Sequence, residues 1–238
     1  MDEFSIFQKQ IEVLSQSHRV IAIDFRGHGQ SDDPHTGHTV PQYADDVKQI
    51  IDALGLKDVV LVGWSMGAFV TWEYVTQFGT DNIKGTVIID ESASDFKWKD
   101  WSYGFADLDT LIHLMQSVQT DQDALLDGFL PLMFKAELKA DDLAWMKAQM
   151  KQVNPATAGA ILFDQTTRDF RQQLIHFTVP TLICFGRDEK IVPLRAADYF
   201  LQQMTQSELI IFEQSSHCPF LEEPEQFNRE LLNFMNKI

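Results

Sequence analysis

The sequence predicts an α/β protein with a mostly parallel sheet, flanking helices and an inserted block of helices. Short apolar runs rich in β-branched residues alternate with segments of helical periodicity, a pattern typical of parallel strands joined by right-handed crossovers. This alternation stops between residues 92 and 174, where only helical periodicity is found, and then resumes. A length of 238 residues accommodates one such domain with an insertion.

The first part of the core is expected to cover residues 1–91. Apolar residues at helical spacing predict a helix over residues 4–17, and further helices over 40–54 and 68–78. Short β-branched runs predict buried strands at residues 20–23, 59–62 and 86–89.

The helical block is expected to cover residues 92–174, and the second part of the core residues 175–238. Apolar stripes predict helices around residues 108–118, 125–133 and 145–150, and Asn154 followed by Pro155 opens a fourth. The core then continues with predicted strands at 181–185 and 209–212 and predicted helices at 194–204 and 224–236.

Composition and charge exclude several functions. The 35 acidic residues outnumber the 19 basic ones, and the resulting charge of −16 makes nucleic acid and membrane surfaces poor partners. Only two cysteines are present, so no disulfide framework is expected, and scattered histidines predict no metal site. With an acidic N-terminus and no long apolar run, we expect a cytoplasmic protein.

The sharpest motif is Gly63-Trp64-Ser65-Met66-Gly67, between a predicted strand and a predicted helix. In that context G-x-S-x-G is a nucleophile elbow, in which a tight turn presents the serine above the sheet. The turn is expected to need glycine at both flanking positions, Gly63 and Gly67. The Met66 N–H lies at the start of the helix, where it is expected to donate to an oxyanion.

A nucleophilic serine needs a base, and the base needs an orienting acid. His217 follows the last predicted strand, and Asp188 lies in the loop after the preceding one. Catalytic groups of open parallel sheets gather at these carboxyl ends. We therefore predict Ser65, His217 and Asp188 as nucleophile, base and acid. Asp90 is the second choice for the acid, and Glu189 is also a rival.

These residues resemble the α/β-hydrolase fold superfamily, most closely its small cofactor-free esterases and the non-haem haloperoxidase group. The resemblance rests on four segments, at residues 23–31, 63–67, 186–193 and 216–224. It implies a Ser65–His217–Asp188 triad, an acyl-enzyme mechanism without a cofactor, and a lid formed by residues 92–174.

One departure from the family concerns the oxyanion hole. The family normally begins with further strands and a His-Gly loop that supplies a second oxyanion donor, and this sequence has neither ahead of its first helix. About 25–35 residues of the family pattern are therefore expected to be absent, including a strand between those predicted at 20–23 and 59–62. An incomplete sheet of this kind would favour homo-oligomers or aggregation.

The resulting expectation is a serine hydrolase for a small or medium, apolar carboxylic ester. Cap aromatics are candidates for an apolar pocket, although each one also fits a role in packing. The alternatives are a ligand-binding or truncated member without activity, and hydrolysis of amides, lactones or carbon–carbon bonds. The pocket candidates are Trp64, Trp98, Trp101, Phe129 and Trp145.

Overall fold

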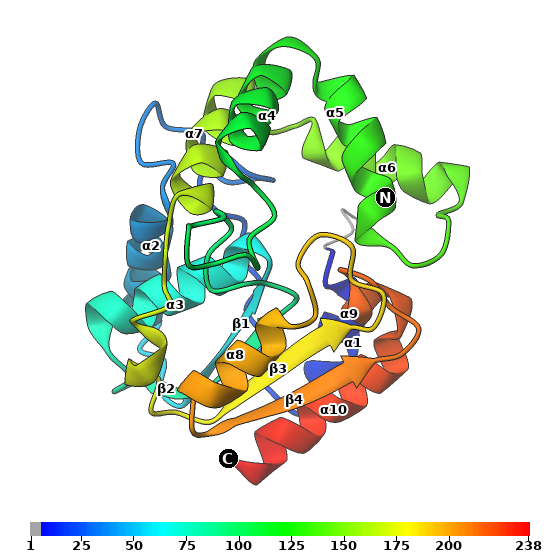
Figure 1. Cartoon of the computed structure of the whole chain (residues 1–238). Helices are drawn as coiled ribbons and strands as arrows, with labels where there is room; N and C mark the ends of the chain where they lie inside the picture. The colour runs from blue at the N-terminus through cyan, green and yellow to red at the C-terminus, as the bar shows by residue number, and fades with distance from the viewer. Residues whose placement is uncertain (1–5) are drawn as a thin grey trace.

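A computed structural model describes residues 6–238 and shows a parallel sheet with helices on both faces (Figure 1). Its strands are β1 (Val59–Trp64), β2 (Ile83–Ile89), β3 (Thr181–Gly186) and β4 (Ser207–Phe212), in the spatial order β1-β2-β3-β4. All three pairings are parallel, so the four carboxyl ends lie along one edge of the sheet. The fold class and these four strands were predicted correctly from the sequence.

Alternation along the strands supplies a core on each face of the sheet. On one face, Ile88 and Ile183 pack with Trp72 beneath α2 (Val40–Ala53), α3 (Met66–Phe78) and α8 (Ala196–Gln203). On the other face, Ile89 and Cys184 pack toward α1 (Gln8–Leu14), α9 (Pro219–Glu222) and α10 (Pro224–Lys237). The short helix α9 was not expected from the sequence. The predicted helix at 4–17 starts partly outside the described residues.

Helices α4–α7 lie between β2 and β3 in the chain and group together at the top of Figure 1. They are α4 (Leu108–Thr120), α5 (Gln122–Phe129), α6 (Ala140–Met150) and α7 (Pro155–Thr166), with a 3₁₀ turn at Leu130–Met133. Asp107 and Asn154 cap α4 and α7 by accepting hydrogen bonds from Thr110 N and Ala156 N. Asp164 of α7 accepts a hydrogen bond of 2.8 Å from Val40 N, which ties this block to the core.

The strand predicted at residues 20–23 is not formed. These residues are irregular, and Ile21 and Ile23 are 39% and 37% exposed. Within residues 6–238, β1 pairs only with β2, and no strand lies between β1 and residues 20–23. A β-branched run becomes a strand only when a neighbouring strand accepts and donates its backbone hydrogen bonds, and the described part of the chain supplies no such neighbour to residues 20–23.

Among the helices of residues 6–238, none combines the length and hydrophobicity that a membrane crossing requires.

Candidate active site

Ser65 occupies the sharp turn between β1 and α3. Its backbone has φ 50° and ψ −119°, a strained conformation for a residue with a side chain. A Cβ atom on Gly63 would lie 2.3 Å from the carbonyl oxygen of Gly67, so the turn closes only with glycine at position 63. The prediction that Gly67 is equally required is wrong, because a Cβ there would meet no atom within 4 Å.

Met66 is the first residue of α3, so its N–H has no acceptor within the helix. The positive end of the helix dipole lies at the same point. This N–H is therefore free to donate to an anion held over Ser65. Its role as an oxyanion donor stays a prediction.

His217 lies in the loop after β4, with a side chain that is 2% exposed. Its backbone carbonyl accepts a hydrogen bond of 2.8 Å from Trp64 Nε1, and the two rings are 5.5 Å apart. The residue before the nucleophile thus holds the residue predicted as the base. Both Ser65 and His217 line one pocket, although their side chains are not hydrogen-bonded to each other in this structure.

The carboxylate that contacts His217 belongs to Glu189. Its Oε2 lies 3.0 Å from His217 Nδ1, and both side chains are almost fully buried. Asp188, the predicted acid, is not brought to His217. Its side chain is 46% exposed and Oδ2 forms an ion pair of 2.7 Å with Lys135.

The turn after β3 explains why Glu189 rather than Asp188 faces inward. Oε1 of Glu189 accepts hydrogen bonds from Ile191 N at 2.5 Å and Val192 N at 3.0 Å. These contacts lock the carboxylate across its own loop and leave Oε2 for the imidazole. Asp188 lies in the preceding turn, where its exposed side chain pairs with Lys135.

Asp90, the second choice for the acid, lies behind Glu189 rather than against His217. Its two carboxyl oxygens accept hydrogen bonds of 3.0 and 3.2 Å from Gly186 N, and it is also hydrogen-bonded to the Glu189 side chain. Complete burial and the neighbouring charge of Glu189 raise the pKa of Asp90 well above its usual range. Asp90 therefore lies behind Glu189 and is not placed to orient His217.

Neither cysteine is a competing nucleophile. Cys184 and Cys218 are buried free thiols, and burial raises the pKa of each well above its ordinary value. Cys218 follows His217 directly, but its side chain packs in the apolar core with Phe220.

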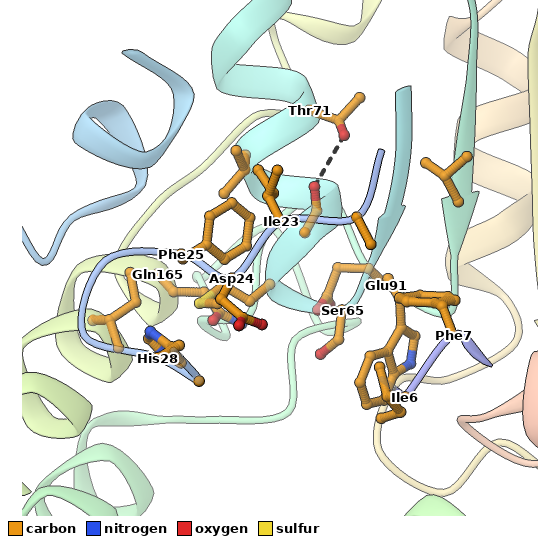
Figure 2. A pocket seen from close by; sticks show the side chains of 18 of the residues that line it. Ile6, Phe7, Ile23, Asp24, Phe25, His28, Ser65, Thr71, Glu91 and Gln165 are labelled. Atoms are coloured by element: carbon orange, nitrogen blue, oxygen red, sulfur yellow. Dashed lines mark hydrogen bonds between the residues drawn. The ribbon is translucent and has the colours of Figure 1, made fainter. Parts of the chain in front are cut away.

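The pocket at Ser65 has a volume of about 2060 Å³, which exceeds the ~300–1,000 Å³ typical of ligand sites. It is large because it joins the space beside Ser65 to the gap between β1 and residues 20–25. Figure 2 shows Ser65 in this space, with Asp24 and His28 on one side and Ile6 and Phe7 on the other.

The aromatic residues predicted to line the pocket divide into two groups. Trp64, Phe129 and Trp145 line it. Trp98 and Trp101 do not, because both are held by the backbone or side chain of Ser94: Trp98 Nε1 donates to Oγ and Trp101 Nε1 to the carbonyl oxygen. Trp101 is also covered by the Arg171 guanidinium, 5.2 Å from its ring.

Comparisons with known proteins agree with this fold. A family model described as the alpha/beta hydrolase fold matches residues 2–224. The AB hydrolase superfamily protein YisY of Bacillus subtilis is 30% identical, with 97% of this chain and 87% of that protein covered. A pimeloyl-[acyl-carrier protein] methyl ester esterase of Nitrosomonas europaea is also 30% identical, over 91% of this chain and 85% of its own length.

Among solved structures, an esterase from Exiguobacterium antarcticum superimposes with a TM-score of 0.92 at 27% identity. A bromoperoxidase from Bacillus anthracis also gives a TM-score of 0.92, at 26% identity. Each alignment covers 97% of this chain and 87% of the other.

Proposed function

Because this chain belongs to the α/β-hydrolase fold family and is a hydrolase of its esterase type, we propose that it cleaves a small or medium, apolar carboxylic ester through an acyl-enzyme. One observation carries the proposal: a strained serine at an elbow shares a pocket with a buried histidine–carboxylate pair. The proposed roles are nucleophile for Ser65, base for His217 and orienting acid for Glu189.

In the first half of the reaction, the Ser65 hydroxyl attacks the ester carbonyl while His217 Nε2 takes its proton. Glu189 accepts the Nδ1–H of His217, which fixes the tautomer whose Nε2 can act as the base. The tetrahedral oxyanion lies at the Met66 N–H. Collapse expels the alcohol, which receives the proton from His217.

In the second half, His217 removes a proton from water and the resulting hydroxide attacks the acyl carbonyl. Collapse of the second tetrahedral intermediate returns the proton to Ser65 and releases the carboxylic acid. The buried Glu189 carboxylate stabilises the imidazolium that forms twice in this cycle.

The proposed preference for apolar acyl or alkoxy groups rests on the pocket wall. Many of the side chains that the helical block contributes to the pocket of Ser65 are apolar. They include Phe129, Leu132, Met133, Trp145, Met146 and Met150. Such a wall gains free energy by excluding water from a hydrocarbon group of the substrate.

The test is labelling with a fluorophosphonate, read by intact mass, on the chain and on its Ser65→Ala variant. The expected result is one phosphonyl adduct on the chain and none on the variant, with hydrolysis of p-nitrophenyl butyrate lost in parallel. A folded, monodisperse chain that takes no adduct, or a Ser65→Ala variant that still hydrolyses the ester, would refute the proposal.

A further inference from the structure

The residue before His217 is hydrogen-bonded both to a carboxylate and to the helical block. Ser216 is fully buried, and its backbone N–H donates a hydrogen bond of 2.7 Å to Oε2 of Glu222. Its hydroxyl donates one of 3.1 Å to the carbonyl oxygen of Leu132, in the 3₁₀ turn of the helical block. Together these two bonds fix the direction in which the chain enters His217.

Glu222 uses its two carboxylate oxygens on two separate segments of the chain. It is the last residue of α9, and its Oε2 holds Ser216 N. Its Oε1 accepts a hydrogen bond of 2.7 Å from Lys135 N, just after the 3₁₀ turn. Bonds from backbone N–H groups to a carboxylate are charge-assisted and stronger than those between neutral groups. One side chain therefore ties the backbone beside the proposed base to the backbone of the helical block.

Lys135 reinforces this junction with its side chain. Its Nζ donates a hydrogen bond of 2.8 Å to the carbonyl oxygen of Glu213, which opens the loop that carries His217. Residues 132–135 are thus fastened to that loop at three points, two at Ser216 and one at Glu213. The loop can shift relative to the helical block only by breaking several of these bonds.

The junction bears on the reaction because the same turn of the helical block forms part of the pocket. Leu132 and Met133 line the space beside Ser65, whereas Glu222 does not. Glu222 can therefore act on the reaction only through the segments that it holds. A misplacement of about 1 Å at a reacting group can cost about a hundredfold in rate, so the segment before His217 must be held accurately.

We propose that Glu222 is a positioning residue for His217, which keeps the histidine in place for proton transfer with Ser65 by tying Ser216 to the helical block. The proposal rests on the esterase function proposed above and adds to it a residue outside the pocket. Loss of one of the two bonds of Glu222 should lower kcat and leave KM nearly unchanged, because no contact with the substrate is altered. The value of kcat should fall whichever half of the reaction limits the rate, since His217 acts in both.

Glu223 supplies a matched control at the next position. Its Oε2 accepts two hydrogen bonds, of 2.8 Å from Gln214 N and of 2.6 Å from Ser215 Oγ. These bonds hold the same loop, and neither reaches the helical block. The two neighbouring carboxylates therefore differ in the feature on which the proposal depends.

The experiment compares Glu222→Gln with Glu223→Gln. An amide has a single acceptor oxygen, so in Glu222→Gln one of the two N–H groups loses its acceptor and faces the amide NH₂ group. In Glu223→Gln the amide oxygen can keep both bonds. For hydrolysis of p-nitrophenyl butyrate, we expect Glu222→Gln to lower kcat by about 10–100-fold with KM within about twofold, and Glu223→Gln to change neither constant by more than about twofold.

Active-site titration separates positioning from a merely structural role. With a fluorophosphonate read by intact mass, Glu222→Gln should end with as many labelled chains as the unmodified protein. The rate constant of labelling should fall by about the same factor as kcat, because labelling also needs His217 to take the proton of Ser65. A structural role would instead reduce the labelled fraction and the melting temperature, and would leave kcat per labelled chain unchanged.

A normal kcat in Glu222→Gln, an equal loss in Glu223→Gln, or a normal kcat per labelled chain would overturn the positioning role while the esterase function stands. An unmodified chain that neither hydrolyses the ester nor takes an adduct would overturn both. If Glu222→Gln does not fold, as judged by circular dichroism, Ser216→Ala decides, because it removes the bond to Leu132 and keeps the backbone N–H on Glu222. Its kcat should fall several-fold at an unchanged KM, and an unchanged kcat would overturn the proposal.

Discussion

Replacing Glu189 and Asp188 by their amides, one at a time, tests which of these two acids after β3 orients His217. Glu189→Gln replaces a buried carboxylate whose Oε1 accepts two backbone N–H groups, from Ile191 and Val192. An amide oxygen must keep those two bonds, so the amide NH₂ takes the place of Oε2 and donates to His217 Nδ1. That forces the imidazole proton onto Nε2, where the nucleophile needs an acceptor.

The expected loss in kcat for Glu189→Gln is about 10³–10⁴-fold, equivalent to about 4–5.5 kcal/mol of transition-state stabilisation. The matched control is Asp188→Asn. It breaks an exposed ion pair with Lys135, which contributes at most about 1 kcal/mol to stability, and the activity should stay within about twofold.

The assay is steady-state hydrolysis of p-nitrophenyl butyrate, with thermal melting to show that both variants fold. Near-normal kcat in Glu189→Gln, together with a large loss in Asp188→Asn, would refute the assignment and return the acid to the residue expected from the sequence. A loss of similar size in both would show that the loop as a whole, rather than one carboxylate, orients the histidine.

Three further predictions concern the elbow, the acid behind Glu189 and the pocket wall. Gly63→Ala should lower the free energy of unfolding by about 3 kcal/mol or more in urea titrations, because its Cβ would clash with the Gly67 carbonyl, whereas Gly67→Ala should raise it by about 0.5–1 kcal/mol. The pKa of Asp90 is raised in the folded chain, so this side chain favours folding at low pH and that contribution is lost as pH rises. Asp90→Asn mimics the protonated side chain, so its free energy of unfolding should increase relative to that of the unmodified chain between pH 4 and pH 8. A difference that stays constant with pH would contradict the assignment. Trp145→Ala should raise KM for a medium-chain ester several-fold with little change in melting temperature, whereas Trp101→Phe should lower stability by about 1–2 kcal/mol and leave KM unchanged.

Strands and helices could be predicted from the sequence where the local residue pattern and the tertiary packing favour the same structure. The β-branched runs of β2 and β3 are buried between two layers of helices, so local preference and tertiary packing favour the same structure. Those of β1 and β4, at the two edges of the described sheet, are mostly half-buried, and Val62 of β1 is exposed. The elbow could be predicted equally well, because the tight turn at the strained serine requires glycine at position 63. The run at residues 20–23 has the same local preference and fails, because strand formation also depends on a neighbour that the pattern does not contain.

The direction of a side chain within a loop could not be predicted from the sequence in the same way. Asp188 and Glu189 are neighbours of similar chemistry, and only the hydrogen bonds from Ile191 and Val192 decide which one faces His217. A usable signal was the position of the acid two and three residues before these N–H groups, since a carboxylate there can close the turn on itself. Trp101 failed as a pocket residue for a comparable reason, because an aromatic side chain in the cap fits packing and lining equally well.

The acid proposed to orient His217 is held through both of its carboxyl oxygens. Oε1 of Glu189 accepts hydrogen bonds from Ile191 N and Val192 N, and Oε2 lies 3.0 Å from His217 Nδ1. Because the carboxylate cannot turn away without losing two backbone hydrogen bonds, it holds the imidazole in one orientation before a substrate enters. Glu189→Gln should therefore reduce kcat/KM by the same factor for esters with different acyl groups, since it acts on the proton transfers and not on what the pocket accepts.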